Sequence, residues 1–109
     1  MAYDEQLAER VRALLSDAPD YDEKKMFGGI GFLIRGNMAC GVKDDGLMLR
    51  VGKEAYEATL QEPDVSIFGK PERPMTGWVL VRPEGLAEDE DLAGWVERGR
   101  EQAMALPPK

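Results

Sequence analysis

Residues 24–38 of the chain read KKMFGGIGFLIRGNM and form its most apolar long window. Apolar residues recur at every second position, a spacing that predicts a β-strand over residues 25–34 with one buried side. These alternating residues are Ile30, Phe32 and Ile34. Three of the twelve glycines lie within four residues of the same window, so we expect a bulge there or the close approach of another backbone.

Two further strands are expected directly after this one. Residues 35–37 have the composition of a tight turn, and residues 43–46 favour a hairpin turn because their glycine tolerates a positive φ. The inward positions of the two strands alternate as before and are Met38, Cys40, Val42, Leu47, Leu49 and Val51. The sequence therefore predicts a three-stranded antiparallel meander.

The remaining elements follow from helical periodicity and from breaker residues. Helices are predicted over residues 4–18, 53–61 and 88–105, and short strands over residues 65–68, at a sheet edge, and 78–81. Residues 20–23 read as an acidic connector and residues 69–75 as an irregular loop. The order α-β-β-β-α-β-β-α predicts an α+β fold of two layers, with an antiparallel sheet of about five strands and the helices packed on one face.

If the helices cover only one face, the other side of the sheet is apolar. The residues expected there are Leu33, Ala39, Met48, Val79 and Val81. An exposed apolar patch of this kind usually marks an interaction surface. Trp78 and Trp95 are interpreted as core anchors, because a stacking platform for bases presents several exposed aromatic side chains in a basic groove.

Composition indicates a single ordinary domain spanning residues 1–109. The apolar share of 43%, the 32% of charged residues and the single cysteine are those of a globular protein without disulfides. No run approaches the roughly 20 apolar residues of a membrane span, and the first residues lack the pattern of a secretory signal. We therefore expect a cytoplasmic protein.

The chain lacks the residues that most enzymes use. It contains no histidine, which removes the usual general base and the commonest transition-metal ligand. Cys40 is expected to be a buried strand residue rather than a reactive thiol, and residues 88–91 to be an acidic helix start rather than a metal site. We accordingly expect no catalytic activity, no cofactor and no metal.

The net charge of −7 is unevenly distributed along the chain. Residues 1–23 carry seven acids against two bases and residues 83–109 seven against three, whereas residues 24–82 carry nine bases against seven acids. The acidic total argues against binding nucleic acid directly, since affinity for phosphates requires clustered Lys and Arg. The mildly basic middle would be the only region to support it.

The chain resembles the N-terminal domain of the TfoX/Sxy competence-regulator family over nearly its whole length. The similar segments are KMFGGIGF at 25–32, GNM at 36–38, LMLRV at 47–51, PM at 74–75 and GW at 77–78. The resemblance implies an α+β domain of the secretion-chaperone-like type. Two-domain members act as positive regulators of DNA-uptake genes together with a cyclic-AMP-responsive transcription factor, whereas this chain resembles a stand-alone single-domain member.

Two functional hypotheses follow from the residues and the resemblance. The first is a non-enzymatic regulatory or protein-interaction domain, possible partners being a transcription factor or a second copy of the chain. The alternative is a domain that binds a small ligand or anion with residues 28–31 and Lys25. The contact residues expected for the first are Lys24, Lys25, Phe27, Gly28, Gly29, Gly31 and Arg50.

Overall fold

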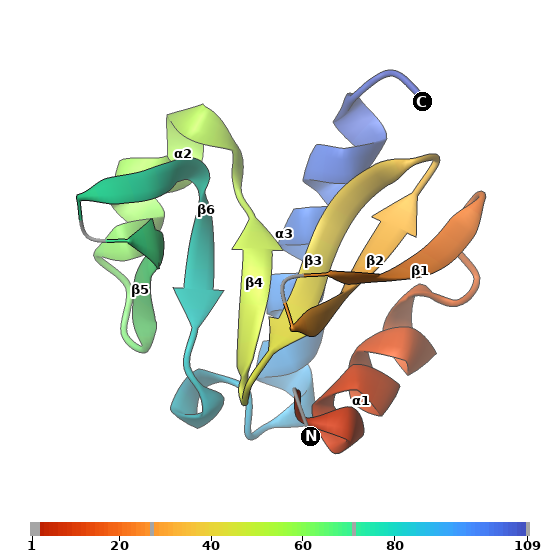
Figure 1. Ribbon diagram of the computed structural model, residues 1–109, viewed down its shortest axis with the longest axis horizontal. Coiled ribbons are helices and arrows are strands. Elements are labelled where there is room, and N and C mark those ends of the chain that lie inside the picture. Colours follow the sequence, from red (N-terminus) through yellow and green to blue (C-terminus); the bar gives the residue numbers. More distant parts are fainter. Residues whose placement is uncertain (1–2, 27, 71, 109) are drawn as a thin grey trace.

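The computed structural model describes residues 3–26, 28–70 and 72–108, and Figure 1 shows how its elements are arranged. A single 3-10 turn, η1, precedes the last helix. In chain order the elements are α1 (Glu5–Leu15), β1 (Tyr21–Met26), β2 (Gly29–Ile34), β3 (Asn37–Lys43), β4 (Gly46–Arg50), α2 (Gly52–Leu60), β5 (Val65–Lys70), β6 (Arg73–Val81), η1 (Pro83–Gly85) and α3 (Asp89–Ala105).

The strands form one antiparallel sheet in the order β1-β2-β3-β4-β6-β5. In Figure 1 the helices lie behind this sheet, with α3 across its centre, α1 toward β1 and β2, and α2 toward β5 and β6. Helix α2 packs on β6 and β5, and α3 packs on β3 and β4. The predicted α+β architecture of two layers, with helices on one face, is confirmed.

The sheet has one strand more than the sequence predicts. Residues 21–26, divided in the prediction between an acidic connector and the start of the long strand, form β1 and pair with β2. The chain reverses at Gly28, whose φ of +74° is a conformation that glycine adopts without steric cost. Strand β1 lies at a sheet edge, where charged side chains are common, so it lacks the apolar alternation that would have revealed it.

The prediction of an irregular loop over residues 69–75 is also wrong. Its two ends belong to β5 and β6, which form a hairpin in which Gly69 opposes Pro74. Strand β4 pairs with β6 only from Trp78 onward, so Pro74 leaves no hydrogen bond to β4 unmade and is tolerated in the strand. The predicted edge position of residues 65–68 is confirmed, because β5 is the outermost strand.

The core fills the space between the sheet and the helices. Most of the inward positions predicted for the first three strands are confirmed, each with no more than 3% of its surface exposed: Ile30, Phe32, Ile34, Cys40, Val42, Leu47, Leu49 and Val51. The prediction that Val79 and Val81 face the other side is wrong. They oppose Leu49 and Leu47, and directly opposed residues of an antiparallel pair share a face of the sheet.

A β-bulge in β3 explains why Ala39 and Met38 lie on the faces opposite to those predicted for them. Phe32 opposes Cys40 while Leu33 opposes Met38, so Ala39 is the extra residue and lies in the core rather than on the other side. The same shift places Met38 opposite Leu33, away from the inward position that strict alternation predicts for it. A β-bulge of this kind cannot be recognised from the alternation of apolar and polar residues along a strand.

Helix α1 is fastened at its start and against β1. The Asp4 carboxylate caps it by accepting hydrogen bonds from the backbone N–H groups of Gln6 and Leu7. Arg12 donates from Nε and Nη2 to the Glu23 carboxylate at 2.6 and 2.8 Å. This hydrogen bonding lowers the pKa of Glu23 below its usual value, so the pair stabilises the contact between helix and edge strand in its ionised form.

Candidate functional site: the open face of the sheet

The face of the sheet turned away from the helices presents a set of residues that the pairing register defines. We call this set the open face; it includes Asp22, Lys24, Gly31, Leu33, Met38, Gly41, Met48, Arg50, Trp78 and Leu80. None of them belongs to the hydrophobic cluster between sheet and helices. Of the apolar residues predicted for this side, Leu33 and Met48 are therefore placed correctly.

Glycines at the centre of the open face make room for methionine side chains. Gly31 and Gly41 oppose each other on β2 and β3. A Cβ atom on Gly31 would lie 2.9 Å from Cε of Met38, and one on Gly41 would overlap Cε of Met48. Met48 is consequently only 2% exposed. These glycines accommodate neighbouring chain atoms, and Met38, which is partly exposed, provides an adaptable apolar side chain at the surface.

Arg50 is the most distinctive group of the open face. Its Nε–H donates to the backbone oxygen of Met38 at 2.8 Å, and its Cζ lies 4.9 Å from the ring centroid of Trp78. Burial lowers the pKa of Arg50, and no carboxylate of the described residues is within ion-pair distance of it. The sequence singled out Arg50 but not its neighbours, because only the pairing of β4 with β6 brings Trp78 beside it.

Trp78 is accordingly not the core anchor that the sequence predicts. It opposes Arg50 on the open face, and its ring centroid lies 6.5 Å from that of Phe68. Trp95 does pack against the core, from α3. An arginine, Arg98, also lies over Trp95, at 4.4 Å, but this guanidinium has an acidic partner, Glu62, at 2.8 Å.

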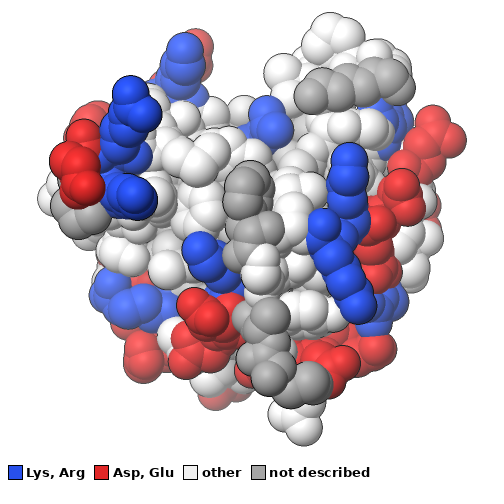
Figure 2. Space-filling model, viewed as in Figure 1, with Lys and Arg blue, Asp and Glu red and all other residues white. Residues whose placement is uncertain are grey.

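The two lysines predicted as contact residues point to opposite faces. Lys24 opposes Gly31 and belongs to the open face, whereas Lys25 opposes the core residue Ile30. Both are exposed. Figure 2, which looks onto the open face, shows mostly uncharged atoms on both sides of the grey ones, with Lys and Arg atoms among and around them and most acidic atoms toward the periphery.

The glycine segment does not form one site with Lys25. Gly28 is exposed in the β1–β2 turn, Gly29 is approached by the backbone oxygen of Val42, and Gly31 lies on the face opposite to the side on which Lys25 projects. Phe27 lies outside the described residues. The structure therefore brings together Lys24, Gly31 and Arg50 on one face and places Lys25 on the other.

The remaining chemical candidates take structural positions. Cys40 is buried in the core, and this burial raises the pKa of its thiol to about 12, as expected of a residue that is not a nucleophile. Within residues 3–26, 28–70 and 72–108, no group of three or more acidic or cysteine side chains is arranged to hold a metal ion. No helix in this part of the chain is long and apolar enough to cross a membrane.

Comparison with protein families places this sheet and its glycine segment in a known group. Residues 13–103 match the model of the TfoX N-terminal domain. The chain belongs to the TfoX N-terminal domain family. The match includes all six strands, α2, most of α3 and the last turn of α1, and the TfoX N-terminal domain is not an enzyme family. The chain matches no curated protein.

Proposed function

We propose that this TfoX N-terminal domain is a non-enzymatic interaction domain that binds an acidic segment of a partner protein on its open face. The observation that carries the proposal is Arg50, a partly buried cation without a carboxylate partner among the described residues. The resemblance to the TfoX/Sxy regulators favours a transcription factor as the partner.

The surroundings of Arg50 suit a carboxylate better than any neutral group. Its Nε donates to the Met38 oxygen and one side of its guanidinium lies against Trp78, so the group is held in place, and no carboxylate of the described residues pairs with its terminal N–H groups. A charge-assisted hydrogen bond to a carboxylate would be about twice as strong as a neutral one. It would also offset the desolvation that now disfavours the charged form of Arg50.

The charge around Arg50 supports the same partner. Lys24 adds a second cation to the open face, against one acidic residue, Asp22, on the same strand, in a chain whose overall charge is −7. A basic face on an acidic molecule orients an acidic partner during encounter, and it discourages association through the other surfaces. The partly exposed Met38 beside it would contact the apolar side chains that accompany the acidic residues.

Capture of partners from native cell extract tests the proposal with matched variants. Arg50→Gln removes the unpaired guanidinium, while Arg98→Gln removes the second Arg–Trp contact, which lies on the helix side and has its own acidic partner. We expect Arg50→Gln to weaken capture about tenfold or more, because truncating one partner of a buried charge pair at an interface costs roughly 2–5 kcal/mol and a partly buried pair costs less. Arg98→Gln should leave capture unchanged.

A second matched pair uses the two lysines of β1. Lys24→Glu and Lys25→Glu reverse the same charge at adjacent exposed positions on opposite faces of the sheet. We expect Lys24→Glu to weaken capture several-fold and Lys25→Glu to have a much smaller effect, with the melting temperature of both near that of the wild type. Equal effects within each pair of variants would contradict the assignment of binding to the open face.

A further inference from the structure

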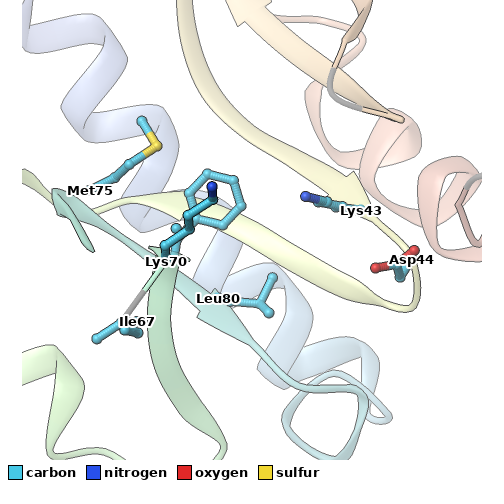
Figure 3. Close-up of a pocket in the computed structure, with 8 residues that line it drawn as sticks. Lys43, Asp44, Ile67, Lys70, Met75 and Leu80 are labelled. Atoms are coloured by element: carbon cyan, nitrogen blue, oxygen red, sulfur yellow. The ribbon is translucent and has the colours of Figure 1, made fainter. Parts of the chain in front are cut away.

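A pocket of about 400 Å³ lies beside the open face, between the β3–β4 turn and the β5–β6 hairpin. Its volume falls in the range of roughly 300–1,000 Å³ that is typical of small-molecule sites. Figure 3 shows side chains from both segments converging on it. The lining residues are Lys43, Asp44, Ile67, Phe68, Gly69, Lys70, Met75 and Leu80.

The walls of the pocket are mainly apolar. Ile67, Phe68 and Leu80 are each partly exposed through it. Met75, on the first part of β6, has 44% of its surface exposed. An apolar group of a ligand would gain free energy by covering these side chains, since burial contributes about 25 cal/mol for each Å² removed from water.

Two lysines stand at the mouth of this apolar pocket. In Figure 3 the side chains of Lys43 and Lys70 both extend over the pocket, from β3 and from β5. Nζ of Lys43 lies 5.9 Å from the ring centroid of Phe68. Neither lysine forms an ion pair with the described residues. Asp44 is the acidic member of the lining, so the pocket residues carry one net positive charge.

We propose that this pocket binds a small amphipathic carboxylate. The alkyl or aryl body of the ligand lies against Phe68, Met75 and Leu80, and its carboxylate lies between the ammonium groups of Lys43 and Lys70. A neutral molecule of the same shape lacks the ionic contacts, and a cation of the same shape is repelled. The pocket shares Leu80 with the open face, but neither Arg50 nor Lys24, on which the proposed partner-binding function rests, lines it.

Titration with octanoate tests the proposal, with 1-octanol as the neutral analogue. Amide chemical shifts of the isotopically labelled chain report both affinity and location. We expect saturable shifts concentrated in β5, the start of β6 and the β3–β4 turn, weaker binding of 1-octanol, and an octanoate affinity that falls as salt is added. Absence of saturable octanoate shifts, equal binding of the alcohol, or shifts centred on another surface would each overturn the proposal.

Variants with a matched control separate the lysines from total charge. Lys43→Gln/Lys70→Gln should raise the dissociation constant for octanoate about fivefold or more, since each exposed ion pair contributes modestly. Lys25→Gln/Lys53→Gln changes the net charge equally at exposed positions that do not line the pocket and should leave affinity unchanged. Equal losses in the two double variants would overturn the assignment. Failure here leaves the capture experiments on Arg50 and Lys24 unaffected.

Discussion

Replacing Gly99 with alanine tests the close approach of α3 to the sheet. An added Cβ would lie 2.5 Å from the backbone oxygen of Ala39 and 3.0 Å from Cδ1 of Leu49. The carbonyl belongs to the bulge of β3, so relief requires the helix or the strand to move. Overpacking of this kind costs about 1–3 kcal/mol.

Gly94→Ala in the same helix is the matched control. Nothing lies within 4 Å of a Cβ at Gly94, which is exposed. Alanine should therefore stabilise the helix there by about 0.8–1 kcal/mol through its higher helix propensity. The same gain applies at position 99, so the difference between the two variants isolates the steric cost and is expected to be about 1–3 kcal/mol.

Urea denaturation of both variants and the wild type measures this difference in the free energy of unfolding. Thermal melting should give the same order, with about 4 °C for each kcal/mol in a domain of this size. Gly94→Ala should melt above the wild type and Gly99→Ala below Gly94→Ala. If the two variants are stabilised equally, α3 does not approach the Ala39 carbonyl as closely as described, and the argument fails.

Two further predictions follow from the perturbed ionisable groups. Because Arg12 lowers the pKa of Glu23 below its usual value of 4.5, the stabilisation is present above the unfolded pKa and is lost as pH falls through the folded one. Glu23→Gln should lower the free energy of unfolding by about 1 kcal/mol at neutral pH, and urea curves should show the deficit shrinking below about pH 4. Cys40, whose pKa burial raises to about 12, should react with a thiol reagent at about pH 8 only as fast as the chain unfolds; rapid labelling of the native protein would contradict its burial.

The candidate site could be predicted from the sequence only in part. Arg50 stands in a segment that resembles the TfoX family and Lys24 directly precedes another, and both lie on the open face. Lys25 directly follows Lys24 in the sequence but projects to the other side of the sheet. The pairing of Trp78 with Arg50 spans 28 positions, and no local pattern reports it.

The lysines of the pocket illustrate the same limit. Lys43 ends β3 and Lys70 ends β5, so only the folded sheet brings them to one cavity. The hairpin that carries Lys70 was not recognised from the sequence, because its prolines and glycines are typical of loops. The pocket therefore depends on a segment whose structure was predicted incorrectly from the sequence.

The sequence by itself determined the α+β class, the helices on one side, the first buried strands and the burial of Cys40. These features depend on periodicity and breaker residues, which act over a few positions. The tertiary structure alone decided that β1 is a strand, that Val79 and Val81 face the core, and that Arg50 meets Trp78. Strand register is set by distant partners, and a shift of one residue moves every side chain of a strand to the opposite face.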